Sequence, residues 1–143
     1  MISYEELTKY LVNVGKRHPN LQLVKFDTDV SVINSSSFVC PAFIISPAPL
    51  NLDNNSVVQY SFQLLYLDKL NQEETNYTSI LEYGFQTILQ YISVIELEYK
   101  IVKGITIDPV LEGYEGGLLI GVQTTIQIED HYNVTRNKNL FYE

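Results

Sequence analysis

The chain has 143 residues, of which 45% are hydrophobic, and its formal net charge is −8. This length allows one domain with a real core but not two, and the hydrophobic fraction excludes an intrinsically disordered chain. The excess of acidic residues disfavours ordinary nucleic-acid binding, which needs basic side chains to displace counterions from phosphates. It does not exclude a surface past which DNA moves without sticking.

The sequence lacks the usual signs of a membrane or secreted protein. No apolar run approaches the roughly 20 residues that cross a bilayer. The first residues, MISYEELTKY, contain no basic segment followed by an apolar one, and Cys40 has no second cysteine with which to form a disulfide. We therefore expect a protein that stays in the cytoplasm where it is made, without membrane contact.

The first predicted element is a helix that ends near Gly15 and Pro19. Ser3, followed three residues later by Glu6, fits a capping box at its start. Apolar residues then recur at spacings of three and four along one stripe, formed by Leu7, Tyr10, Leu11 and Val14. Because charged residues lie on its other side, we expect this helix to lie on a sheet.

A strand-rich region follows, with predicted strands at 21–26, 37–46 and 57–67 and a loop at 46–56. Pro41 cannot donate a ladder hydrogen bond, which places it at an edge, a bulge or a strand start. Alternation in the third strand predicts one face made of Val58, Tyr60, Phe62, Leu64 and Tyr66.

The second helix follows the segment 68–74. Its predicted core-facing stripe consists of Leu81, Phe85, Ile88, Ile92 and Ile95. Gly84 lies within this helix and costs about 1 kcal/mol relative to alanine, which a close approach to the sheet would offset.

The last third predicts strands at 97–107 and 118–128, the latter half-buried with a polar outer face. The order α-β-β-β-α-β-β indicates an α+β fold: a single, mostly antiparallel sheet with two helices packed against it. We expect one domain over residues 1–128 and a C-terminal tail over 129–143, which docks on a neighbouring subunit.

The run VLEGYEGGLLIG, at 110–121, holds four of the seven glycines. A P-loop needs Lys-Ser or Lys-Thr after its last glycine, and a dinucleotide-binding fingerprint must open a helix. This run leads into a strand instead, and its acids Glu112 and Glu115 would repel a phosphate. It therefore predicts a turn between strands, in which a backbone with positive φ is needed, with Tyr114 at its tip.

Other polar residues form no recognisable catalytic constellation. His18 and His131 lie near element ends and favour exposed loop histidines over metal ligands. Cys40, in an apolar strand, favours a small core residue over a nucleophile. The carboxylates at 72–74 and 128–131 favour solvated loops. We predict no catalytic residue, no metal and no cofactor, and hence a protein that is not an enzyme.

Tyrosine is the more informative residue, with 11 Tyr and no Trp. Tyr99 and several others occupy places where burial within a monomer is not obvious, and tyrosine is enriched at interfaces, although ordinary half-buried strand positions are the alternative. The tail ends in NLFYE, apolar groups for which a monomer has little use. Our candidate inter-subunit contacts are Tyr114, Tyr132, Leu140, Phe141 and Tyr142.

The middle of the chain resembles a known family. The segments FVCPAFIISPAP and VQYSFQLLYLDKLNQEETNYTSILEYGFQTILQYI are similar to the phage tail terminator, or tail-completion, family of head–tail joining proteins. The resemblance covers roughly residues 3–128, and its matching positions are Tyr60, Phe62, Leu67, Asp68, Leu70 and Asn76. The composition, rich in Asn, Ile and Tyr, is also similar to structural proteins of crAss-like phages.

The resemblance implies a structural virion protein, assembled in the host cytoplasm into a homo-oligomeric ring. Its implied neighbours are portal, connector or tail proteins, with DNA passing through the lumen without specific binding. Two other classes stay open: a small-ligand-binding or regulatory α+β module with a pocket on its sheet, and a small hydrolase that uses carboxylates such as Asp68 and Glu74.

Overall fold

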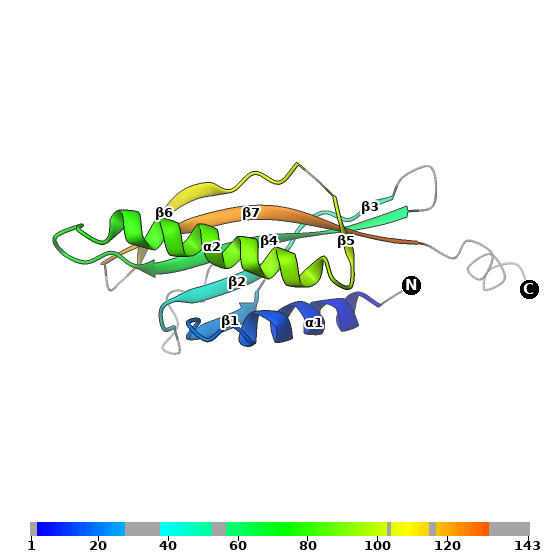
Figure 1. The fold of residues 1–143 in the computed structure, drawn as a ribbon, viewed down its shortest axis with the longest axis horizontal. Coiled ribbons are helices and arrows are strands. Elements are labelled where there is room, and N and C mark those ends of the chain that lie inside the picture. The colour runs from blue at the N-terminus through cyan, green and yellow to red at the C-terminus, as the bar shows by residue number, and fades with distance from the viewer. Residues whose placement is uncertain (1–2, 28–37, 53–56, 103, 115–116, 132–143) are drawn as a thin grey trace, which may run out of the picture.

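The computed structural model describes residues 3–27, 38–52, 57–102, 104–114 and 117–131 (Figure 1). Within them the chain forms two helices and seven strands, which confirms the α+β prediction. In chain order these are α1 (Tyr4–Lys16), β1 (Leu23–Phe26), β2 (Ala42–Pro47), β3 (Asn51–Leu52), β4 (Val57–Lys69), α2 (Tyr77–Ile95), β5 (Lys100–Ile101), β6 (Asp108–Tyr114) and β7 (Gly117–His131).

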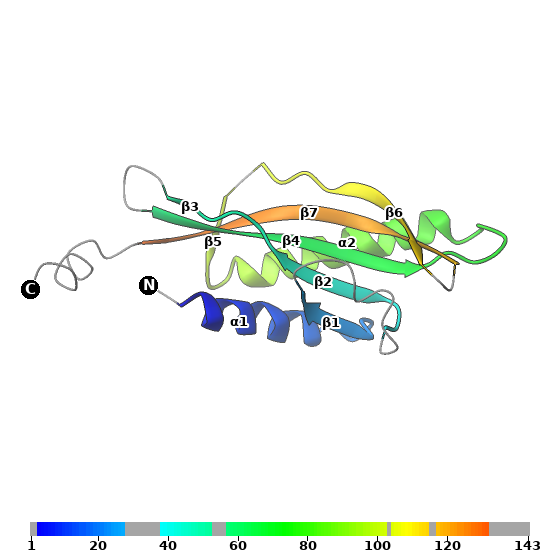
Figure 2. The same cartoon turned by 180° about the vertical axis from the view of Figure 1, so that it is seen from behind.

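All the strands belong to one sheet, in the order β1-β2-β4-β7-β5, with β3 also paired to β4 and β6 to β7. The β1–β2 pair is parallel and the other pairs are antiparallel. The long β4–β7 pair runs from Val57–His131 to Lys69–Leu119 and forms the spine of the sheet. Both helices lie on one face of it, and Figure 2 shows the opposite face without a helix.

The first helix follows its predicted pattern. The Ser3 hydroxyl accepts a hydrogen bond from the Glu6 backbone N–H at 3.1 Å and caps the helix. Leu7, Leu11 and Val14 are buried in the core, as the stripe predicts.

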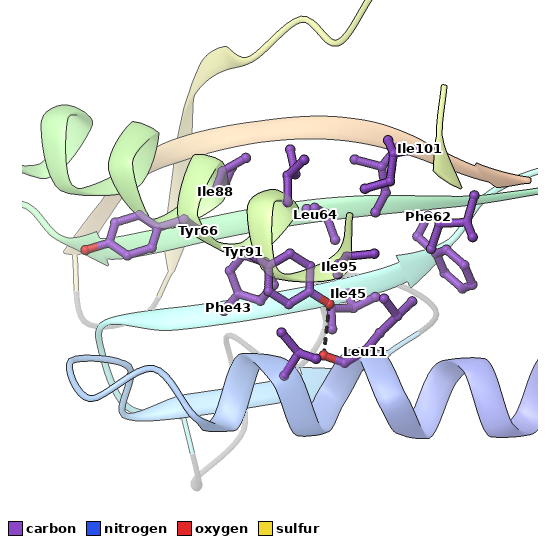
Figure 3. Close-up of a cluster of buried hydrophobic side chains, with 14 of the residues drawn as sticks. Leu11, Phe43, Ile45, Phe62, Leu64, Tyr66, Ile88, Tyr91, Ile95 and Ile101 are labelled. Carbon is purple, nitrogen blue, oxygen red and sulfur yellow. Dashed lines mark hydrogen bonds between the residues drawn. The ribbon is translucent and has the colours of Figure 1, made fainter. Parts of the chain in front are cut away.

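The core lies between the helices and the sheet (Figure 3). The predicted inner face of β4 is buried along its whole length, at Val58, Tyr60, Phe62, Leu64 and Tyr66. The Tyr91 hydroxyl crosses between the helices and donates to the Leu11 carbonyl at 2.9 Å. The polar tip of this ring is therefore satisfied inside the apolar layer.

The buried face of α2 differs from the predicted stripe. Leu81 and Phe85 are only partly buried, and the helix instead buries Ile80, Gly84, Thr87, Ile88, Tyr91, Ile92 and Ile95. The cause is Gly84, where an added Cβ would lie 2.8 Å from a Val122 methyl and 2.9 Å from the Tyr66 ring. The predicted close approach to the sheet is thus confirmed, and it rotates the glycine onto the buried side.

The link between β4 and α2 explains several positions of the family resemblance. The Asn76 side chain accepts from the Asn71 N–H and donates to the Lys69 carbonyl, both at 3.0 Å, so it ties the end of the strand to the start of the helix. Tyr60, Phe62 and Leu67 are buried strand residues. The matching pattern therefore encodes a strand–turn–helix unit.

The predicted strand at 97–107 is wrong. Among the described residues of this range, only Lys100 and Ile101 form a strand, and the next strand begins at Asp108. Gly104 has a φ of 93°, and the Thr106 carbonyl accepts the Thr124 hydroxyl instead of a ladder N–H. The backbone thus leaves the sheet between β5 and β6.

Two other boundaries shift. The predicted loop at 46–56 contains β3, which pairs with Val58 and Gln59. The last strand continues past residue 128 to His131, where it pairs with Val57, so Glu129–His131 belong to the sheet. Pro41 immediately precedes β2, so of its three predicted placements the structure favours the strand start.

The helix-free face of the sheet is polar only in part. Midway along it, the amides of Gln63 and Gln123 hydrogen-bond at 3.0 Å, as expected for a polar outer face. Nearer the start of β7, however, a second small cluster is buried, formed by Ile44, Leu65, Leu67 and Leu119. A Cβ at Gly121 would overlap the Tyr66 carbonyl oxygen, so β4 and β7 approach too closely there for any side chain.

Candidate functional site

The clearest concave feature lies where the end of α1 diverges from α2. Two cavities, of about 390 and 210 Å³, share the residues His18, Leu21, Thr87 and Gln90. They therefore form one continuous depression, which we call the interhelix groove. It lies beside the C-terminal end of strand β4, and Pro41 lines its margin.

The polar half of the groove contains Asp68, Tyr66 and Tyr83. Partial burial raises the pKa of the Asp68 carboxyl above its ordinary value, and a hydrogen bond from the Lys69 backbone N–H, at 2.8 Å, opposes that rise. Within the described ranges, no basic side chain forms an ion pair with Asp68. Figure 3 shows the Tyr66 ring at the margin of the core, with its hydroxyl pointing away from it.

The apolar half of the groove is lined by Val14, Pro19, Tyr91 and Val94, with Arg17 at its rim. Val14 and Tyr91 are buried, whereas Val94 is 38% exposed. This half is thus a shallow apolar floor between the helices, next to a cation.

His18 joins the two halves. Its Nδ1 accepts from the Asn20 backbone N–H at 3.2 Å, and its Nε2 lies 3.0 Å from the Gln90 side-chain oxygen. The first contact requires an unprotonated Nδ1, so Nε2 carries the proton and donates to Gln90. The prediction of an exposed loop histidine is corrected here: His18 is half-buried and bridges α1 to α2.

Cys40 packs against the small outer cluster, but it is only half-buried and precedes β2, so the prediction of a core residue in a strand is met only in part. Burial, with a smaller contribution from the Asp68 charge, raises the pKa of its thiol to about 11. The thiol is therefore protonated at neutral pH, whereas a cysteine nucleophile needs the thiolate.

The carboxylates singled out in the sequence do not gather. Glu73 and Glu74 are exposed, and Glu129 pairs with Lys100 at 3.1 Å. In the part of the chain that the structure describes, no three side chains of His, Cys, Asp or Glu are grouped to hold a metal ion.

The glycine-rich run forms the end of β6 and the start of β7, which pair at Tyr114 and Gly117. It is a strand-to-strand connection, as predicted, and Gly117 has the positive φ expected for it, 130°. The backbone of Tyr114 ends β6. The other candidate contacts, Tyr132, Leu140, Phe141 and Tyr142, lie outside the described residues.

The Tyr99 side chain packs against another residue of the same chain. Its ring meets Tyr10 edge-on, with centroids 5.1 Å apart, and is half-buried. Of the tyrosines considered for interfaces, this one is half-buried within the chain as the alternative expects, but it lies in the bend before β5 and not in a strand.

Large apolar side chains are exposed at both ends of the β4–β7 pair. Leu111 and Leu118 lie at the β6–β7 end, beside a cavity of about 300 Å³ that Tyr77 also lines. Leu52, on β3, lies at the other end, next to the start of β4. These two apolar patches are Leu111 with Leu118 at one end and Leu52 at the other.

No protein-family model and no curated protein matches this sequence. Neither helix, within the residues described, has the length and apolar character needed to cross a membrane.

Sequence reasoning did not find the interhelix groove. Asp68 was singled out only by the family pattern and as a possible hydrolytic acid, and His18 only as a loop residue. The available signal was an acid near the end of the buried strand, at the next inward-facing position of its alternating pattern.

Proposed function

We propose that this chain is a structural subunit of a ring at the head–tail junction of a phage particle, through which DNA passes. The observation that carries the proposal is the separation of the two apolar patches. One patch is Leu111 with Leu118 and the other is Leu52, and they lie at opposite ends of the β4–β7 strand pair. Unlike patches at opposite ends favour head-to-tail contacts, and such contacts close into rings when the rotation permits.

Two further features support this role. The resemblance to tail terminators implies an α+β fold, which the chain has. The middle of the helix-free face presents uncharged groups, with Gln63 and Thr125 exposed. Among the described residues, this middle part offers no cation to retain a phosphate backbone, and the lysines of the same face, Lys25, Lys69 and Lys100, lie toward its margins.

The test combines assembly and location. Sedimentation and negative-stain images of the purified protein are expected to show closed rings, alone or with a connector protein, and mass spectrometry is expected to find the chain in purified particles. Absence from particles contradicts the proposal, because a ring subunit at this junction stays in the finished virion.

A small-ligand-binding module is the second candidate, and the interhelix groove favours it. Its larger cavity, about 390 Å³, falls within the size range of ligand pockets. Ligand-induced thermal stabilisation without any assembly would support this candidate over the ring.

A further inference from the structure

The two halves of the interhelix groove differ in chemistry. Asp68 lines the polar half, and Val14, Tyr91 and Val94 line the apolar half together with Arg17. Asp68 has lost part of its hydration without gaining a cation among the described residues. A ligand that complements this groove has a basic group for the polar half, followed by apolar and acidic groups for the other half.

Residues 132–143 of the chain itself have this order. Arg136 and Lys138 come first, Leu140, Phe141 and Tyr142 follow, and Glu143 is next. The segment carries two of the nine basic residues and one of the 17 acidic ones, so its charge is opposite in sign to that of the whole chain.

A chain cannot fill its own groove with this segment. Asp68 pairs with Ile120, and His131 lies eleven residues further along β7, which is about 36 Å at about 3.3 Å per strand residue. The seven residues from His131 to Lys138 span at most about 25 Å. Even with the length of a lysine side chain added, Lys138 falls short of Asp68, and Arg136 falls further short.

Figure 1 shows the same separation. The end of β7 lies at one end of the molecule, and the arrowhead of β4, which carries Asp68, lies at the other. An arginine or lysine of residues 132–143 that pairs with Asp68 must therefore come from another copy of the chain.

We propose that the interhelix groove binds residues 136–143 of a second copy of this chain, with Arg136 or Lys138 paired to Asp68 and with Leu140 and Phe141 on the apolar floor. Glu143 then lies toward Arg17. The proposal rests on the self-association that the proposed function contains. Because groove and segment are different surfaces of one chain, each contact leaves a free groove and a free segment, which makes the assembly head-to-tail.

A binding titration tests the contact without requiring a ring. The probe is a fluorescent peptide with the sequence of residues 132–143. The receptor is the full chain carrying Arg136→Glu, Lys138→Glu and Phe141→Ser, so that its own segments leave the grooves open. We expect saturable binding of one peptide per chain, weakened by roughly tenfold or more by Asp68→Asn, the loss expected for a charged hydrogen-bonded pair. Asp108→Asn, an exposed acid on β6, is the matched control and leaves the affinity unchanged.

A mixing experiment tests the direction of assembly. Full chains carrying Asp68→Lys have an intact segment, and full chains carrying Arg136→Ser, Lys138→Ser and Phe141→Ser have an intact groove. The second variant gains no acidic group that could pair with the lysine introduced in the first. Each variant alone is expected to remain monomeric. An equimolar mixture is expected to form dimers that grow no further, as measured by sedimentation velocity, because only one of the two contacts can form.

The outcomes separate this proposal from the ring function. No peptide binding, or equal binding to the receptor with and without Asp68→Asn, overturns the groove contact. If the chain nevertheless forms rings in particles, the proposed function stands without it. Peptide binding that depends on Asp68, by a chain absent from particles, supports the groove contact and overturns the head–tail role. Agmatine binding in place of the peptide would make the groove a small-ligand site and also overturn the contact.

Discussion

The space between the two helices and the sheet has two regions that treat polar groups differently. In the packed region, around Phe43 and the hydroxyl of Tyr91, this hydroxyl donates to the Leu11 carbonyl, and Phe43 and Leu11 are fully buried. The Tyr91 ring also lines the groove floor, where the two regions meet. In the interhelix groove, Asp68 is partly buried and forms no ion pair among the described residues. The first region is built for stability, and the second retains a cost that a binding partner would relieve.

The largest expected effect belongs to the packed region. Phe43 is fully buried, and its ring centroid lies 4.7 Å from that of Tyr91. Phe43→Ala should lower the free energy of unfolding by about 3–5 kcal/mol, through lost transfer free energy and a cavity. Urea denaturation at neutral pH measures it. The matched change on the groove floor, Val94→Ala, should cost about 0.5 kcal/mol, and equal losses at both sites would remove the distinction between the regions.

Gly84 marks the place where the packed region meets the groove. Gly84→Ala adds a Cβ within 3 Å of Tyr66 and Val122, both buried. Overpacking of about 1–3 kcal/mol outweighs a helix-propensity gain of about 1 kcal/mol, so we expect a net loss of up to about 2 kcal/mol. Gln86→Ala, on the exposed side of the same helix, is the control for propensity. A variant at Gly84 more stable than the wild type would contradict the close approach.

Tyr91→Phe removes one hydrogen bond from the packed region and leaves the ring in place. We expect a loss of about 1 kcal/mol in the free energy of unfolding, the usual net contribution of such a bond. The counterpart in the groove is Tyr83→Phe, at a side chain that is 60% exposed, for which denaturation should show almost no change. A comparable loss at Tyr83 would mean that the groove also stabilises the fold.

The packed region could be predicted from the sequence because its buried apolar residues recur at the spacings of a helix or a strand. Leu7, Leu11 and Val14 repeat with the period of a helix, and Phe62 and Leu64 belong to alternating strand positions. The pattern of apolar residues predicted the wrong buried face of α2, however. Gly84 lies against the sheet, but a glycine has no side chain and so does not contribute to an apolar pattern.

The groove could not be predicted in the same way. His18 and Gln90 are 72 positions apart and meet only because α1 ends beside the middle of α2. The strand predicted at 97–107 failed for a related reason: its apolar alternation is real, but the Thr124 hydroxyl takes the Thr106 carbonyl and the chain leaves the ladder. Such side-chain contacts between distant segments leave no local pattern.

The smallest expected effect on stability has the opposite sign from the others, and it concerns Asp68. Its pKa is raised in the folded chain, so the folded state binds a proton more readily than the unfolded state. Stability contributed by the protonated carboxyl is therefore present at acidic pH and is lost as the pH rises through its ordinary value toward the raised one. Above that window the ionised carboxyl opposes folding.

Asp68→Asn removes the pH-dependent contribution of this carboxyl to stability and keeps the shape of the side chain. We expect the variant to be at least as stable as the wild type at pH 7, and any advantage to vanish below the ordinary pKa of the carboxyl, where both side chains are neutral. Urea titrations at the two pH values measure the difference, with Asp108→Asn as the exposed control. The same substitution should weaken binding of the 132–143 peptide. A variant that is less stable at pH 7 would show that the ionised Asp68 stabilises the fold. The groove would then resemble the packed region, where the polar groups contribute to stability.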